Sequence, residues 1–216
     1  MAGRTAWFPG HMAKGTRQLE ELLDKLDVVV EVRDARAPEL TASPLTKKFA
    51  RRKPVWIVMT KRDLADKDVT AQWLGYYKNN KREAWAFDLL SRQIAPLKQA
   101  FTRCKPQYRE LRVAVVGIPN VGKSALLNLL IGKKSAPVGG IPGITRGVSW
   151  YRGGDFLVVD SPGILDPRSG AAIQRALAWL GCSKADVIGG YDAGTGTYKG
   201  LELIESVYPK WKIVPG

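Results

Sequence analysis

The residues best suited to chemistry form the run Gly117-Ile-Pro-Asn-Val-Gly-Lys-Ser124. Glycines at this spacing let the backbone wrap so that successive N–H groups point inward at a phosphate group, and Lys123 can then reach the β- and γ-phosphate oxygens. Ser124 offers a hydroxyl to Mg²⁺, and a helix starting near it presents its positive end to the anion. A turn that merely joins a strand to a helix does not need Lys-Ser after its second glycine. The run therefore predicts a phosphate-binding loop.

The sequence on either side supplies the strand and helix that such a loop requires. The apolar run Leu111-Arg-Val-Ala-Val-Val116 predicts a buried strand, and Ala125-Leu-Leu-Asn-Leu-Leu-Ile131 predicts a helix. We therefore expect a nucleotide to contact the loop and the first residues of this helix. The residues expected in contact are Asn120, Val121, Gly122, Lys123, Ser124 and Ala125.

Strands and helices alternate along most of the chain. The predicted strands cover residues 28–33, 54–59, 83–87, 111–116, 147–151 and 156–159, and the predicted helices cover 15–26, 44–52, 69–79, 93–103, 171–180 and 200–207. This alternation indicates an α/β protein whose sheet is mostly parallel and doubly wound.

A second motif, Asp160-Ser-Pro-Gly163, follows the apolar strand predicted at 156–159. An aspartate in this position holds Mg²⁺, often through water, while the N–H of Gly163 meets the γ-phosphate. Thr145 lies in a glycine- and proline-rich segment between the two motifs, where its hydroxyl can complete the Mg²⁺ shell when a γ-phosphate is present. We therefore expect Ser124, Thr145 and Asp160 to hold the metal and the segment around Thr145 to act as a switch.

A third motif, Thr60-Lys61-Arg62-Asp63, ends the strand predicted at 54–59. A carboxylate placed as Asp63 is accepts two hydrogen bonds from the N1–H and amino group of guanine, which adenine cannot donate. Thr60, Lys61 and Asp63 are therefore predicted to bind guanine. The alternative is an ordinary turn, and with that interpretation the chain would be an ATPase.

The order of these motifs is unusual, because the base-reading motif precedes the phosphate loop instead of following Asp160-Ser-Pro-Gly163. This is the order of a circularly permuted GTPase. A fold depends on adjacency in space, so relocated termini require only a linker between the old ends. The polar connector at residues 103–110, which contains Pro106, is the predicted linker.

The composition adds a polyanionic partner to this prediction. The formal net charge is +14, and residues 1–165 hold 28 Lys and Arg against 15 Asp and Glu. Such a charge favours nucleic acid as the partner, although each basic cluster alone is also typical of a solvated surface. No run approaches the roughly 18 apolar residues of a membrane span. The two cysteines and the single histidine form no disulfide or zinc pattern, so we expect a cytoplasmic, globular protein with no membrane partner.

Together these motifs resemble the YlqF-type ribosome-biogenesis GTPases. The segments that carry the resemblance are Trp7-Phe-Pro-Gly-His-Met12, Asp34-Ala-Arg-Ala-Pro38, Thr60-Lys-Arg-Asp63, Gly117-Ile-Pro-Asn-Val-Gly-Lys-Ser124, Gly143-Ile-Thr145 and Asp160-Ser-Pro-Gly163. The resemblance covers roughly residues 5–168. It implies a GTPase that binds GTP and GDP with Mg²⁺, and that acts late in assembly of the large ribosomal subunit through the precursor particle and its ribosomal RNA.

The resemblance also bears on catalysis. Ile164 stands where many signalling GTPases place a glutamine that orients water, and an aliphatic side chain cannot hydrogen-bond that water. His11 matches the family's proposed catalytic histidine and would act beside Lys123, while packing or RNA contact are equal alternatives for a histidine next to aromatic residues. Asn120 resembles the asparagine with which related GTPases use K⁺. We expect hydrolysis to be slow alone and faster on the ribosomal particle.

The chain departs from the family pattern in two places. The segment Ala84-Trp-Ala-Phe-Asp88 lacks a clear Ser-Ala motif for contact with guanine O6, and the tail does not resemble the family's helical C-terminal domain. We expect residues 1–167 to form the GTPase domain and 168–216 a short, partly helical extension. The alternative function, from another class, is a non-catalytic RNA-binding module that GTP regulates.

Overall fold

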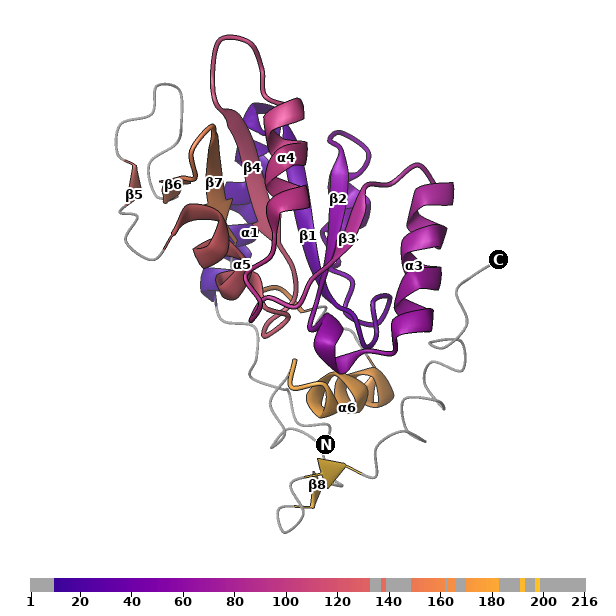
Figure 1. The fold of residues 1–216 in the computed structure, drawn as a ribbon. Coiled ribbons are helices and arrows are strands. Elements are labelled where there is room, and N and C mark those ends of the chain that lie inside the picture. The colour runs from indigo at the N-terminus through magenta and orange to yellow at the C-terminus, as the bar shows by residue number, and fades with distance from the viewer. Residues whose placement is uncertain are drawn as a thin grey trace.

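A mostly parallel sheet is the central element of the computed structural model, which describes residues 10–132, 137–138, 149–161, 163–165, 170–182, 191–192 and 197–198 (Figure 1). Seven strands pair in the order β3-β2-β1-β4-β7-β6-β5. They are β1 (Val28–Asp34), β2 (Val55–Thr60), β3 (Ala84–Ala86), β4 (Leu111–Val116), β5 (Pro137–Val138), β6 (Trp150–Arg152) and β7 (Phe156–Asp160). The β3-β2-β1-β4-β7 pairs are parallel, while β6 and β5 add an antiparallel edge. A separate pair joins β8 (Tyr191–Asp192) to β9 (Thr197–Tyr198).

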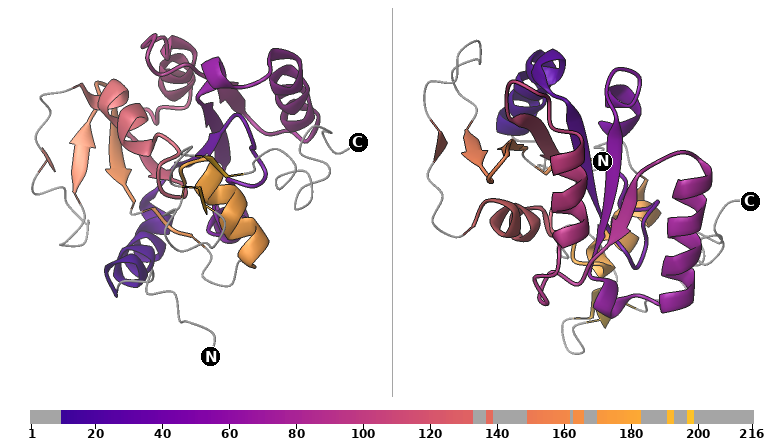
Figure 2. Two further views of the ribbon diagram at one scale, coloured as in Figure 1. Left: turned by 90° about the horizontal axis from the view of Figure 1, so that it is seen from below. Right: turned by 45° about the horizontal axis from the view of Figure 1, so that its top comes forward.

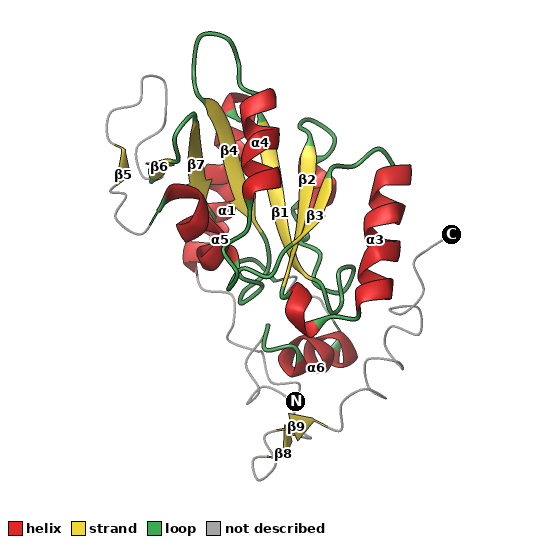
Figure 3. Ribbon diagram, in the orientation of Figure 1, coloured by secondary structure: helices red, strands yellow, loops and turns green. Residues whose placement is uncertain are grey.

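Helices cover both faces of this sheet (Figure 3). The helices are α1 (Gly10–Leu22), η1 (Leu23–Lys25), α2 (Thr46–Phe49), η2 (Arg62–Leu64), α3 (Lys67–Asn79), α4 (Ala95–Arg103), α5 (Lys123–Ile131) and α6 (Ala171–Trp179). The buried side chains of α4 and α5 pack on one face, and those of α1, α2 and α3 pack on the other. The predicted fold class, a doubly wound α/β sheet, is confirmed.

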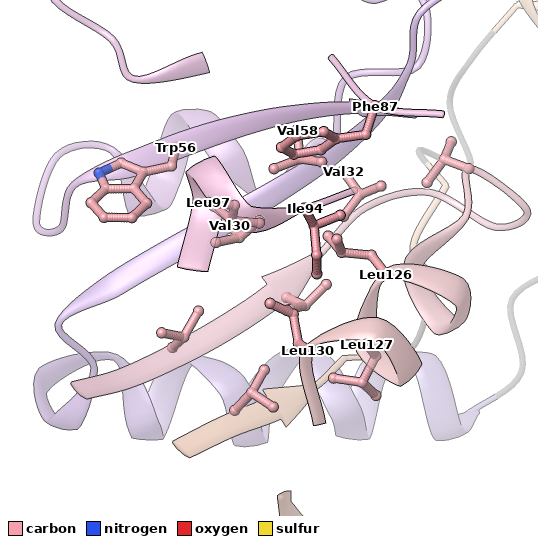
Figure 4. Close-up of a cluster of buried hydrophobic side chains, with 14 of the residues drawn as sticks. Val30, Val32, Trp56, Val58, Phe87, Ile94, Leu97, Leu126, Leu127 and Leu130 are labelled. Carbon is pink, nitrogen blue, oxygen red and sulfur yellow. The ribbon is translucent and has the colours of Figure 1, made fainter. Parts of the chain in front are cut away.

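The strands are buried on both faces because successive side chains point to opposite sides of the sheet. Val30 and Val32 of β1 face α4 and α5, whereas Val29 joins the cluster that contains the leucines of α1. Figure 4 shows Leu97 of α4 and Leu126 of α5 directed at these valines. Each fully buried aliphatic side chain contributes roughly 1.5–3 kcal/mol, so the two clusters fix the sheet rigidly.

Helix α6 lies at the edge of the sheet where the parallel strands end. Figure 1 shows it below the lower ends of β1, β2 and β3, and Figure 2 shows it crossing that edge when the molecule is seen from below. Ala176 and Leu177 of α6, with Leu180 and Cys182 after it, belong to the same buried cluster as β4 and α5. The helix is thus packed on the core of the sheet.

The boundaries of several elements differ from the sequence prediction. α1 begins at Gly10, before the predicted start at residue 15, and α2 keeps only the middle of the predicted helix at 44–52. β6 begins at Trp150, and Ser149 before it, which was predicted as strand, lies outside the strand. Residues 147–148 of that predicted strand and the helix predicted at 200–207 lie outside the described residues. The segment between α4 and β4 is neither helix nor strand, as expected for the linker. In the part of the chain that is described, no helix is long and apolar enough to cross a bilayer.

Candidate functional site

The phosphate loop connects β4 to α5, as its sequence requires. Gly122 has φ +94°, a backbone conformation that residues with a side chain rarely adopt. A Cβ there would lie 3.3 Å from Thr60 Oγ1. Lys123 begins α5 and is 8% exposed, and its Nζ donates to the carbonyl of Ile118 at 2.7 Å. Burial lowers the pKa of Lys123, against the charge of Asp160, which raises it. The ammonium is thus held inside the loop, where a phosphate would meet it.

The base-reading motif lies directly against this loop. Thr60 ends β2, and its hydroxyl lies 2.5 Å from the carbonyl oxygen of Val121 and 3.2 Å from that of Arg33. The contact is possible because β1 is the only strand between β2 and β4 in the sheet, so the ends of all three meet at one edge. Motifs far apart in sequence therefore share one site.

Lys61 and Asp63 follow Thr60 at the same edge. Lys61 has φ 55°, and its Nζ forms an ion pair of 2.9 Å with Asp34 Oδ2. Asp63 is exposed in η2, where its carboxylate is accessible to a ligand. The N–H of Arg62 donates to the carbonyl of Phe87 at 3.3 Å. This bond joins the motif to the segment after β3, whose sequence lacks a clear Ser-Ala motif for contact with guanine O6.

Asp160 ends β7 on the other side of the phosphate loop. Although Asp160 is exposed, desolvation by the surrounding protein raises the pKa of its carboxyl, and the charge of Lys123 opposes the rise. Gly163 is pressed against the loop, because a Cβ there would lie 2.9 Å from the backbone nitrogen of Pro119 and 3.0 Å from Lys123 Nζ. A side chain at this position would therefore collide with the loop, so the close approach favours glycine.

The residues around Lys123 also fit a magnesium ion. Ser124 is exposed at the first turn of α5, and Asp160 lies within electrostatic reach of Lys123. A hydroxyl and one carboxylate, completed by phosphate oxygens and water, are typical of Mg²⁺ sites in nucleotide-binding proteins. Among the described residues no group of three His, Cys, Asp or Glu side chains gathers into a metal site. The donor set therefore fits an ion bound together with a phosphate.

Two residues of mechanistic interest, Thr145 and His11, are placed only in part or not at all, and a third, Ile164, is buried. Thr145 lies outside the described residues. His11 lies in α1, where the backbone is described but its side chain is not. Ile164 is 5% exposed and belongs to the buried cluster that contains Leu19 and Leu22 of α1. Its side chain thus packs in the core.

Sequence reasoning assigned no role to Asp34 and Arg36, although it singled out the segment that contains them. Asp34 is fully buried, and Arg36 donates to both of its carboxylate oxygens. The sequence signal was an acid and a base directly after a buried strand. The turn after α6 was also missed: Leu180 accepts from Arg36 and Gly181 accepts from Asn120, each at 2.9 Å.

The fold and the three motifs define a P-loop GTPase with circularly permuted motif order. A family described as "50S ribosome-binding GTPase" matches residues 112–191. Ribosome biogenesis GTPase A of Priestia megaterium is 36% identical over 219 residues, which cover 94% of this chain and 75% of the relative. The chain belongs to the ribosome biogenesis GTPase A family.

Solved structures agree with this assignment. GNP-bound YlqF from T. maritima is 27% identical with a TM-score of 0.63, over 94% of this chain and 78% of that one. Its GDP-bound structure gives a TM-score of 0.61 at 27% identity, over 92% of this chain and 86% of the other. The predicted resemblance and fold are confirmed.

Proposed function

We propose that the chain binds GTP and GDP at the edge where β1, β2, β4 and β7 end, hydrolyses GTP to GDP and phosphate, and acts as a nucleotide-dependent assembly factor for the large ribosomal subunit. The observation that supports this most is the contact between Thr60 and Val121, because it sets a guanine-reading motif against a phosphate loop. The name that the relatives carry, ribosome biogenesis GTPase A, supports the proposed role in ribosome assembly.

Different residues at this edge are assigned to the phosphates and to the base of the nucleotide. The amides of the loop and Lys123 stabilise the charge on the β- and γ-phosphates. Asp63 accepts from guanine, with Thr60 and Lys61 holding the base-reading loop. The remaining contacts are the phosphate-loop residues Asn120, Val121, Gly122, Ser124 and Ala125, together with Gly163 against the γ-phosphate.

We assign magnesium to Ser124, Asp160 and Thr145. When bound, the ion neutralises charge on the β- and γ-phosphate oxygens. The amide of Asn120 is assigned to K⁺, which would add a positive charge beside the phosphates. The proposed ordering of Thr145 by a γ-phosphate makes its segment the nucleotide-sensing switch.

Water positioning is assigned to His11. Ile164 is buried and cannot hold the water, yet it packs in the same cluster as the leucines of α1. α1 leads through η1 into β1 and so runs back along the sheet, which places its beginning toward the edge where the strands end (Figure 1). A histidine at that end of α1 supports the role. Since the buried Ile164 cannot orient water, we propose that hydrolysis is slow in isolation and stimulated by the ribosomal particle.

Ribosomal RNA is the proposed partner in that particle, in the cytoplasm. The net charge of +14 supports it, and several of the cations are exposed. Lys47 and Arg51 are exposed around α2, where Lys48 and Arg52 are paired with acidic residues of the α1–η1 segment.

Residues 1–167 are proposed to form the GTPase domain and residues 168–216 an extension, whose helix α6 packs on that domain.

Single-turnover hydrolysis of GTP with and without purified large ribosomal subunits tests this function. In K⁺ buffer we expect the particle to accelerate the wild-type protein and not His11→Ala, with equal GTP affinity for both. Arg17→Ala, an exposed change on the same helix, is the matched control and should respond like the wild type. Fast hydrolysis without particles would contradict the proposed stimulation. GTP binding without hydrolysis under any condition would favour the non-catalytic RNA-binding module.

A further inference from the structure

The carboxylate of Asp34, at the end of β1, is the centre of a small charged network. Its side chain is 0% exposed. Arg36 Nε donates to Oδ1 at 3.0 Å, Arg36 Nη2 donates to Oδ2 at 2.7 Å, and the backbone N–H of Arg36 also reaches Oδ1 at 3.0 Å. A buried carboxylate is stable only when its charge is paired and its oxygens are hydrogen-bonded. The two-point contact with Arg36 meets both conditions.

Lys61 is the second cation on this carboxylate. Its Nζ lies 2.9 Å from Asp34 Oδ2, and its backbone has φ 55°. A left-handed backbone is uncommon for residues other than glycine and persists only when the surrounding structure imposes it. The ion pair fixes the end of this side chain, while the turn after β2 fixes its backbone. Lys61 is therefore held at both ends, two residues before Asp63, which is proposed to bind guanine.

Arg36 extends the network to the turn that follows α6. Nη2, which binds Asp34, also donates to the carbonyl of Leu180 at 2.9 Å. The next residue, Gly181, accepts a bond of 2.9 Å from Asn120 of the phosphate loop. The turn at Leu180 and Gly181 thus accepts two hydrogen bonds. Asn120 donates one from the phosphate side of the nucleotide edge, and Arg36 donates the other from the base side.

We propose that Asp34 and Arg36 are positioning residues for guanine-nucleotide binding, which fix the side chain of Lys61 in its place beside the base. The inference rests on the proposed function, because it concerns the same site. Neither residue lies in the phosphate loop or in the Asp160-to-Gly163 segment, so both act on how firmly the nucleotide is held and not on the hydrolytic step. Organising a binding loop in advance strengthens binding by removing the entropy loss of ordering it.

The first experiment compares Arg36→Ala with the wild-type full chain. We expect GDP affinity to fall about tenfold, while the single-turnover rate at saturating GTP is unchanged. The side chain of Arg36 is 21% exposed, and its removal leaves Asp34 with Lys61 as its cation, so urea unfolding of the variant is measured beside its affinity. Arg36→Lys keeps a charge on Asp34 but not the two-point contact, and we expect an intermediate loss.

The chain contains a matched control at the other end of the same strand. Asp27 immediately precedes β1, and Arg109 binds both of its carboxylate oxygens, at 2.6 and 2.8 Å. This pair has the same chemistry but lies far from the nucleotide edge. Arg109→Ala should therefore leave GDP affinity at the wild-type value. An equal loss of affinity in both variants would overturn the proposal, because it would show a general effect of losing such a pair.

A double-mutant cycle separates positioning from a structural role. If Asp34 acts through Lys61, then Asp34→Asn weakens GDP binding in the wild-type background but adds little once Lys61→Ala is present. If the losses of GDP-binding free energy caused by Asp34→Asn and Lys61→Ala simply add in the double variant, the proposal is overturned. Should Asp34→Asn fail to fold, the cycle of Arg36→Ala with Lys61→Ala gives the same test. A wild-type protein that does not bind GDP would overturn the proposed function and this inference together, whereas tight wild-type binding that Arg36→Ala leaves unchanged overturns the inference alone.

Discussion

The hydroxyl of Thr60 lies 2.5 Å from the carbonyl oxygen of Val121, and this contact joins two halves of a site that the chain order separates. Thr60 closes the strand before the base-reading motif, while Val121 lies in the middle of the phosphate loop. In a permuted chain no short segment connects these motifs. Their relative position is instead held by the sheet and by this direct bond.

Thr60→Val should weaken nucleotide binding, because it removes the donor and leaves a buried carbonyl without its partner. Such a loss costs about 1–3 kcal/mol, which corresponds to roughly 5- to 150-fold in affinity if it falls on the loop. Calorimetric titration with GDP measures it. Thr102→Val, an exposed threonine whose hydroxyl donates to Lys98 at 3.2 Å within α4, is the control and should bind normally. Equal affinities for both variants would count against a role for the contact.

Gly163→Ala should reduce GTP hydrolysis and GTP affinity more than GDP affinity. A methyl group there would come within 3.0 Å of Pro119 and Lys123, so the segment must withdraw from the phosphate loop. The segment after β7 is the one expected to approach the γ-phosphate, which GDP lacks. Gly75→Ala, where nothing lies within 4 Å, is the matched change and should leave both affinities intact. Equal losses for GTP and GDP would indicate a general distortion of the loop.

The two cysteines should differ strongly in their reaction with alkylating reagents. Cys104 is exposed, whereas Cys182 is 0% exposed. Burial, together with the nearby charge of Asp34, raises the pKa of Cys182 to about 11. Since the thiolate is the reactive form, iodoacetamide at pH 7–8 should label Cys104 first, as measured by mass spectrometry of peptides. Rapid labelling of Cys182 in the folded protein would mean that the turn after α6 opens readily.

Acid should remove the stabilisation that Asp34 provides. Burial alone would raise the pKa of Asp34, but the hydrogen bonds and charges of Arg36 and Lys61 outweigh it and lower the pKa below its ordinary value. The folded state therefore holds fewer protons than the unfolded state just below pH 4, and stability falls as the pH falls through the folded pKa. Urea unfolding of wild type and Asp34→Asn should show a wild-type advantage at pH 6–7 that shrinks in acid. A difference that does not change with pH would contradict this assignment.

Asp160 should behave in the opposite way. Desolvation raises its pKa, so the ionised carboxylate opposes folding at neutral pH in the absence of a metal ion. Asp160→Asn should therefore raise the thermal midpoint of the nucleotide-free protein at pH 7 and lose this advantage as the pH falls toward 4. The same variant should bind GTP with little response to Mg²⁺. A lower midpoint at pH 7 would show that the charge stabilises the site.

The sequence was sufficient to predict the sheet, because buried parallel strands have a strong apolar signal and the phosphate loop fixes which strand leads into it. Element ends were less predictable: α1 begins at Gly10, where no apolar periodicity marks it. The network around Asp34 could not be predicted from spacing alone. It depends on contacts among the turns that contain Asp34, Lys61 and Leu180, and these turns meet only in the folded chain.

The position of β1 also bears on how the chain folds as it is synthesised. β1 pairs with β2 on one side, a neighbour that follows it closely in sequence, and with β4 on the other, which lies beyond α4 and the linker. Until β4 leaves the ribosome, β1, which is an interior strand of the finished sheet, is an edge strand with an unpaired row of backbone groups. Pairing across such a sequence separation is intrinsically slow. The nascent chain therefore passes through a stage in which its base-reading half can be ordered while the edge that will join the phosphate loop is still open.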